Sequence, residues 1–334
     1  MSIRGLMYMT APKLCAFALA ALCLLFSKAE ISLAADYPTR PIRVIVAVAP
    51  GGIADIFMRA LSERLTTIMK QPFIIENKPG GTFNIAARNC AEATPDGYTI
   101  CLMPGEPLTY NQHLFKNPGF DATADFAPIT NLFFITQVLA VNTSLGVKDF
   151  DSLAALSKQK VGTLSYTSPA LAHTMFVEEF KTRTGADIVW VPFKGGGDAM
   201  ANFLSGSVPI VFIGLGNVLP YIEAGKATLL VSDGNTRSSI VPDVPTVRET
   251  GYTGVELTRA YFGLVAPAKT PPDAIATLHR AIGEIYKDKD FVQKQLISRA
   301  LDPAFGSPTE YGDLLKHDRI IAEKIVKASG REPQ

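Results

Sequence analysis

Residues 42–55 have the sequence IRVIVAVAPGGIAD, which contains a strand, a glycine turn and the start of a helix. The nearly continuous apolar run over 42–48 is typical of a strand that is buried on both faces, as the strands of parallel sheets are. Pro50, Gly51 and Gly52 interrupt this run, and apolar residues then recur at helical spacing as far as Ile68. A strand, a tight turn and a helix in this order predict an α/β fold.

The same alternation continues along the chain and predicts two α/β units. Strands are expected over 73–76, 98–103, 138–141, 161–166, 188–191, 210–213, 228–231 and 262–266, and helices over 53–68, 82–93, 151–158, 170–183, 198–204 and 218–224. The C-terminal third predicts three more helices, over 271–287, 288–299 and 308–327. Because strands and helices alternate, we expect parallel sheets covered by helices on both faces. Two such units imply a ligand cleft between them.

The first 35 residues have the pattern of a secretory leader. Lys13 precedes an apolar run over 14–26, and small residues follow as far as Ala35. The run is short for a membrane span, so we predict a signal peptide over residues 1–35 and release of the chain into the periplasm. A retained membrane anchor is the alternative, and no later segment is long and apolar enough to cross a membrane.

The charge of the chain argues against nucleic acids and anionic membranes as partners. The 334 residues include 32 Lys and Arg against 31 Asp and Glu, a net charge of +1. Removal of residues 1–34 takes away three basic residues and one acidic residue, which leaves a charge of −1. A near-neutral chain lacks the basic surface that these polyanions attract. The remaining length of about 300 residues is sufficient for two domains.

Cys90 and Cys101 are the cysteines that remain after the leader. In an oxidising compartment they can form a disulfide if the predicted helix that holds Cys90 folds back onto the next strand. The sequence leaves both this bond and a pair of buried free thiols open. Neither cysteine has histidine partners at metal-binding spacing, so no metal site is expected.

Four turns between predicted strands and helices present backbone amides that can bind an anion. For each, an ordinary structural role is the alternative, such as N-capping by Thr167 or Ser168 or a solvated Lys194. Asp55 is expected to face the amides of its own helix rather than a ligand. The fourth turn lacks the full dinucleotide fingerprint, so no cofactor is expected. The candidate residues are Pro50, Gly51, Gly52, Ala54 and Asp55; Ser165, Thr167, Ser168 and Ala170; Lys194, Gly195 and Gly196; and Gly214 and Gly216.

Glu106 follows Gly105 at the end of another predicted strand and is expected to point into the cleft, with a surface position as the alternative. A carboxylate there repels an anion unless the ligand also presents an ammonium or hydroxyl group. Catalytic motifs such as Gly-x-Ser-x-Gly or His-Glu-x-x-His are lacking. Ser168 and His173 are conceivable as nucleophile and base, but a pocket or capping role explains His173 better.

The order and spacing of several motifs resemble one family. The motifs are Tyr37–Ile42, Pro50–Gly52 with Asp55, Glu76–Gly81, Pro95–Thr99, Val191–Gly196, Gly225–Lys226, Arg237–Ser238, Pro242–Thr246 with Glu249 and Gly251, and Ala266–Pro267. Together they resemble the Bug-type, TctC-like extracytoplasmic solute receptors of tripartite tricarboxylate transporters. The resemblance covers nearly all of the chain after the leader.

This resemblance implies an α/β type II periplasmic-binding-protein fold, with two domains that close around a hinge on a small carboxylate. The domains are expected over 36–139 plus 258–334, and over 140–257. The family binds citrate-like acids, dicarboxylates, acidic amino acids or aromatic acids, largely through backbone amides and water. Carried over, one jaw comprises 50–55, Gly105 and Glu106, and Tyr261 lines the hinge side. The other jaw comprises Ser165–Ala170, His173, Lys194–Gly196 and Gly214–Gly216.

Three departures from the family pattern bear on the ligand. Glu106 stands where many relatives have a small hydroxyl residue, which argues against a plain dicarboxylate. Pro169–Leu171 and Ile213–Gly216 replace more glycine-rich or polar stretches, and these changes favour an aromatic or partly apolar carboxylate. We therefore predict a monomeric, non-catalytic receptor that delivers an organic carboxylate to a membrane transporter. A hydrolase using Ser168 and His173, and a sensor that presents its ligand to a membrane kinase, are the alternatives.

Overall fold

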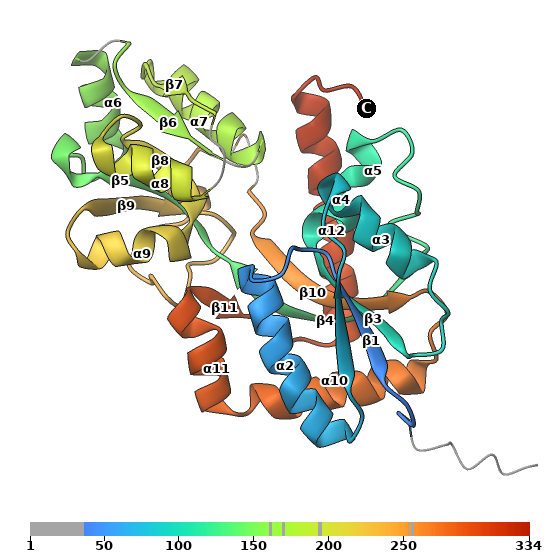
Figure 1. The fold of residues 1–334 in the computed structure, drawn as a ribbon. Coiled ribbons are helices and arrows are strands. Elements are labelled where there is room, and N and C mark those ends of the chain that lie inside the picture. The colour runs from blue at the N-terminus through green and yellow to red at the C-terminus, as the bar shows by residue number, and fades with distance from the viewer. Residues whose placement is uncertain (1–36, 160–161, 169–170, 193–195, 253, 255–256) are drawn as a thin grey trace, which may run out of the picture. The chain divides into compact units, whose positions relative to one another are not determined.

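The computed structural model describes residues 37–159, 162–168, 171–192, 196–252, 254 and 257–334. Residues 40–334 form one unit that contains two β-sheets, each with its own helices (Figure 1). In the described part of the chain, no helix combines the length and the apolar character that crossing a bilayer requires. The α/β class expected from the sequence is confirmed, whereas the division into domains at residues 139/140 and 257/258 stays a prediction.

The first sheet contains six strands in the order β11-β4-β10-β3-β1-β2. Strand β1 pairs in parallel with β2 and β3, while β10 is antiparallel to β3 and β4, and β11 is antiparallel to β4. The carboxyl ends of β1, β2 and β3 therefore lie at one edge of the sheet. The strands are β1 (Ile42–Val46), β2 (Phe73–Asn77), β3 (Thr99–Pro104), β4 (Phe126–Ile135), β10 (Ala260–Pro267) and β11 (Leu301–Pro303).

The second sheet contains five strands in the order β7-β6-β8-β5-β9. Strand β6 is parallel to β7 and β8, and β5 is antiparallel to β8 and β9. As in the first sheet, two neighbouring parallel strands, β6 and β8, end at one edge. The strands are β5 (Gln137–Asn142), β6 (Ser165–Thr167), β7 (Val189–Trp190), β8 (Ile210–Gly214) and β9 (Ala227–Ser232).

The expectation of all-parallel sheets is wrong, because both sheets are mixed. Strand β4 runs directly into β5 at Thr136 without an intervening helix, so the chain passes from one sheet to the other. Strand β10 pairs with strands far away in sequence, and the crossover rule for strand–helix–strand units does not set its direction. Residues 126–135 were also not predicted as a strand, although they form β4, the longest one.

Helices cover both faces of the first sheet, as expected. On one face, α3 and α12 pack on Ile45, Cys101 and Val265. On the other, Phe57 of α2 makes an edge contact with Phe133 of β4, with ring centroids 5.0 Å apart. The helices are α2 (Ile53–Met69), α3 (Asn84–Ala91), α4 (Gly105–Thr109), α5 (Asn111–Leu114), α6 (Phe150–Gln159), α7 (Leu171–Thr184), α8 (Gly196–Ser205), α9 (Leu215–Glu223), α10 (Pro272–Tyr286), α11 (Lys289–Gln295) and α12 (Pro308–Ala328).

The segment 288–299 differs from the single helix expected there. Asp288 caps α11 by accepting hydrogen bonds from the amides of Asp290 and Phe291, but α11 ends at Gln295. A 3-10 turn over Ile297–Arg299 follows, and Ala300 adopts a left-handed conformation (φ 57°) that turns the chain into β11. Local apolar spacing indicates a helix here, yet pairing of β11 with β4 overrides it.

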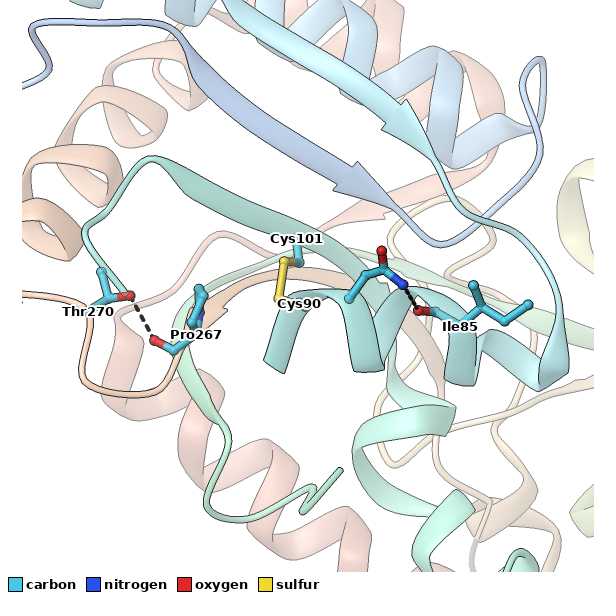
Figure 2. Close-up of a disulfide and its surroundings, with 6 residues drawn as sticks. Ile85, Cys90, Cys101, Pro267 and Thr270 are labelled. Carbon is cyan, nitrogen blue, oxygen red and sulfur yellow. Dashed lines mark hydrogen bonds between the residues drawn. A yellow bond between two sulfur atoms is a disulfide. The ribbon is translucent and has the colours of Figure 1, made fainter. Parts of the chain in front are cut away.

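A disulfide joins Cys90 of α3 to Cys101 of β3, with a Cα–Cα distance of 6.2 Å (Figure 2). It is the first of the two alternatives that the sequence left open. Both cysteines are fully buried between the sheet and its helices. The bond fastens α3 to the strand whose end, Pro104, leads directly into α4.

Candidate functional site

Two adjoining cavities lie beyond the end of β3, and the second of them also reaches the end of β8. The first has a volume of about 270 Å³ and the second about 360 Å³, and they share Glu106, Gln137, Ala260 and Tyr261. The first is lined by parts of α4, α5, α7 and α12, by Gln137 at the start of β5, and by residues 258–261, which lead into β10. The second is lined by Pro104 at the end of β3 and by Ile213, Gly214 and Asn217 at the end of β8. Residues of both sheets therefore enclose the same space.

Glu106 contributes to both cavities from the first turn of α4. Its side chain is half-buried, and no cation of the described residues forms an ion pair with it. Burial raises the pKa of its carboxyl group above the usual value, because the charged form loses water without gaining a counter-ion. The expectation that Glu106 points into a cleft agrees with this placement.

Two tyrosines and a second acid surround Glu106. Burial raises the pKa of Tyr110 to about 12, and the charges of Asp318 and Glu106 add to this effect. Burial also raises the pKa of Tyr261 well above its usual value, again with contributions from Asp318 and Glu106. Both phenols therefore stay protonated at neutral pH, and this wall of the cavity combines negative charge with neutral hydroxyl groups.

Gly105 allows Tyr261 to lie against the start of α4. A Cβ atom at position 105 would come within 2.7 Å of Cζ of Tyr261, closer than real side chains approach. The ring of Tyr261 is held from two other directions by edge contacts with Phe134 and Tyr311. Gly105 and Tyr261, both predicted as site residues, therefore form one packed unit beside Glu106.

His173 lines the first cavity from the start of α7 and is buried. Its ring stacks on Phe212, with centroids 4.1 Å apart, and its Nε2 lies 3.8 Å from Oδ2 of Asp233. Burial raises the pKa of Asp233 although His173 acts to lower it. The other oxygen of Asp233 accepts a hydrogen bond of 2.9 Å from the amide of Gln137. His173 is thus a buried pocket residue, the role preferred for it from the sequence.

Arg259 also lines the first cavity, but its positive charge is committed elsewhere. Its Nη2 donates to Oγ1 of Thr136 at 2.6 Å and forms an ion pair with Asp302. Asp302 accepts further hydrogen bonds from Ser238 and Ser239. Burial acts to raise the pKa of Asp302, but the hydrogen bond from Thr136 and the charge of Arg259 lower it overall. This network ties β11 to the loop after β9.

The turn over 50–55 lines neither cavity, although β1 and β3 end at the same edge. Pro50, Gly51 and Gly52 are exposed, whereas Ala54 and Asp55 are buried. Asp55 accepts a hydrogen bond of 2.9 Å from the Gly51 amide, which agrees with its expected local role. Gly52, the N-cap of α2, makes no side-chain capping bond, and Asp55 is the acidic residue in the first turn of this helix.

The candidates of the second sheet are only partly brought together. Gly214 lines the second cavity, and Gly216 lies in the first turn of α9, whose N-cap Gly214 also makes no side-chain capping bond. Ser165 donates to the carbonyl of Ser207, and Thr167 and Ser168 are buried at the end of β6. Gly196 begins α8. The candidates Ala170, Lys194 and Gly195 lie outside the described residues.

Sequence reasoning missed Tyr110, Gln137, Arg259 and Asp318 as cavity residues. One signal for Asp318 was available, because it lies three residues after Leu315 and four before Ala322, on the buried face of α12. A charged residue on an apolar helix face is rarely buried without a reason. Gln137 and Arg259 lie where the chain passes between sheets, and a single sequence carries no signal for those positions. Across the described residues, no three His, Cys, Asp or Glu side chains form a metal-binding group.

This arrangement, two mixed α/β sheets with cavities at the ends of their strands, is that of periplasmic solute-binding proteins. The chain belongs to the tripartite tricarboxylate transporter family receptors, whose family model matches residues 57–330. The family is one of substrate-binding receptors and not of enzymes. The family, fold and non-catalytic class predicted from the sequence are thereby confirmed.

Relatives match nearly the full length of the chain. Protein BugT of Bordetella pertussis (strain Tohama I) is 31% identical over 298 residues, which are 88% of this chain and 89% of BugT. A solved structure of a periplasmic transporter is 33% identical to this chain, with a TM-score of 0.71. The match covers 89% of this chain and 99% of the transporter chain. R. palustris Rpa4515 with adipate is 28% identical, with a TM-score of 0.72, and covers 89% of this chain and 100% of its own.

Proposed function

We propose that this protein is a periplasmic receptor that captures a small organic carboxylate and delivers it to the membrane subunits of a tripartite tricarboxylate transporter. The observation that carries the proposal is the second cavity, which the ends of β3 and β8 line together. A ligand held there contacts both sheets at once and favours the closed arrangement, because only that arrangement provides both sets of contacts. The leader predicted over residues 1–35 supports export.

Backbone amides provide the proposed anion contacts. Helices α2 and α9 follow strands at the two sheet edges, and neither has a side chain that caps its first amides. Such helix starts attract carboxylates through unsatisfied N–H groups and the helix dipole. We include in the proposed jaws 50–55 with Gly105 and Glu106 on one side, and 165–168, His173 and Gly214 on the other. The structure of Rpa4515 with adipate is a relative that holds a carboxylate.

Binding to purified protein tests the proposal. Thermal unfolding is measured with a panel of dicarboxylates, tricarboxylates, amino acids and aromatic acids, with neutral sugars and simple amines as controls. A ligand at 100 times its Kd adds about 2.7 kcal/mol of stability. We expect carboxylates alone to raise the melting temperature and to be recovered chemically unchanged. A shift produced by sugars or amines, with none from any carboxylate, contradicts the proposal.

Transport requires a second experiment. We expect the ligand-loaded receptor to co-purify with transporter subunits and to support uptake of the radiolabelled carboxylate into cells. Capture of a membrane kinase without uptake would instead identify the protein as a sensor.

A further inference from the structure

We infer that Glu106 makes this receptor select carboxylates that also carry a protonated amino group. The inference rests on the proposed carboxylate-binding function and adds the chemical class of the ligand. It concerns the shared wall of the two cavities, where Glu106 lies beside Tyr110 and Tyr261.

The Glu106 carboxylate faces the cavities without an ion-pair partner among the described residues. The Glu106 side chain is half-buried. No described side chain donates a hydrogen bond to it, and none forms an ion pair with it. Asp55, the acid at the corresponding turn of the neighbouring strand, is by contrast paired with Arg59 at 2.9 Å. An acid left unpaired at a ligand cavity is costly unless a bound group satisfies it.

The other charges around the cavity do not supply this cation. Arg259 is bound to Asp302 and Thr136, and Asp318 adds a second acid on α12. Tyr110 and Tyr261 are neutral hydroxyl groups at neutral pH. His173 lies next to Asp233, and Arg331 lines the cavity from an exposed position near the C-terminus. In the part of the chain that the structure describes, this wall therefore holds two acids, while the two arginines of the first cavity are bound to Asp302 or exposed.

A ligand with two kinds of charge fits this distribution. Its carboxylate can be held by the amides at the start of α9, where Gly214 and Asn217 line the second cavity together with Glu106. Its ammonium group can donate to Glu106 and to the neighbouring phenol oxygens. A plain dicarboxylate of the same size instead brings a second negative charge close to Glu106 in a poorly hydrated space. The side chain at position 106 thus discriminates through attraction and repulsion together.

Matched ligand pairs test the inference by isothermal titration calorimetry on the exported chain. One pair is glutamate and glutarate, and the other is phenylalanine and 3-phenylpropanoate. The two members of each pair differ only in the amino group. We expect the amino member of the pair that fits the cavity to bind at least tenfold more tightly. Charge-assisted hydrogen bonds are worth roughly a factor of 10 to 100 in affinity, so Glu106→Gln is expected to remove most of this preference.

Two controls separate a role in selection from a role in folding. Glu106→Asp keeps the charge and is expected to retain part of the preference, while Glu63→Gln on the exposed face of α2 leaves the preference unchanged. Equal binding of amino and deaminated members, or a preference that survives Glu106→Gln in a folded protein, overturns the inference alone. If no carboxylate binds, with or without an amino group, the proposed function fails and the inference fails with it.

Discussion

The turns after β1 and β3 are neighbours at one edge of the first sheet, yet they treat an acidic residue in opposite ways. After β1, Asp55 is buried and accepts hydrogen bonds from the Gly51 amide, Arg59 and Asn77. After β3, Glu106 has none of these described partners and faces a cavity. Both acids belong to strand-to-helix connections that contain glycine, with Asp55 three residues after Gly52 and Glu106 directly after Gly105.

The difference lies in what each acid serves. Burial acts to raise the pKa of Asp55, but Arg59, Asn77 and the Gly51 amide lower it overall. For Glu106, burial dominates and the pKa rises. An acid whose carboxylate is hydrogen-bonded within its own turn stabilises that turn. An acid without such partners is available to bind a ligand.

The largest expected effect concerns the disulfide between α3 and β3, which supports the second turn, the one that follows β3. It closes a short loop, with a sequence separation of 11 residues, and its loss costs roughly 3 kcal/mol of unfolding free energy by the loop-entropy model. We expect Cys90→Ala with Cys101→Ala to show this loss in urea unfolding, and the reducing agent TCEP to reproduce it in the wild type. A double variant that is as stable as the wild type would show that β3 and its turn need no such support.

The second-largest expected effect concerns the first turn, the one that follows β1. Asp55→Ala leaves the Gly51 amide, Arg59 and Asn77 without their shared acceptor, and we expect a loss of about 2 kcal/mol in urea unfolding. Arg59 is half-exposed and regains water, which keeps the loss moderate. Glu106→Ala is the matched comparison and is expected to cost less, because no described partner is left behind. Equal losses for the two variants would contradict the contrast between the turns.

The first turn was also the part that the sequence predicted best. The apolar run over 42–48 and the helical spacing after Gly52 are local signals, and they correspond to β1 and α2. The role of Asp55 toward its own helix follows from the same local chemistry. The placement of Glu106 beside a cavity agreed with expectation as well, because a strand end in an α/β fold predicts such a position.

What the sequence did not predict depends on contacts between distant residues. Strand β4 was missed, and the mixed pairing of both sheets arises from β10 returning between β3 and β4. The ion pair of Arg259 with Asp302 joins residues 43 positions apart, and Thr136 lies 166 positions from Asp302. No periodicity or turn motif encodes these pairings, so the paired state of Arg259, on which the acidity of the cavity depends, became visible only in three dimensions.

A smaller effect tests the packing of the second turn against that of the first. Gly105→Ala places a Cβ atom 2.7 Å from the ring of Tyr261, which Phe134 and Tyr311 hold in place. We expect a loss of roughly 1–2 kcal/mol in urea unfolding and weaker ligand binding, since Tyr261 lines the cavity. Gly51→Ala meets no atom within 4 Å, and its cost of about 1 kcal/mol comes from its positive φ of 83° alone. Loss of stability without loss of binding at position 105 would argue against a site beside Tyr261.

The smallest effect is a difference in pH dependence between the two acids. The folded-state pKa of Asp55 is lowered, so its stabilising contribution is present above the unfolded value of 3.8 and is lost as the pH falls below it. The folded-state pKa of Glu106 is raised, so its ionisation costs stability as the pH rises above the unfolded value of 4.5. Urea unfolding from pH 3 to pH 7 should therefore show Asp55→Asn losing stability relative to wild type as the pH rises, and Glu106→Gln gaining it.

The gain at position 106 should disappear when an amino-bearing carboxylate saturates the wild type, because its ammonium group then pairs with the ionised Glu106. A gain that persists with bound ligand would place the ammonium group elsewhere and leave Glu106 as an acid without a partner in both states.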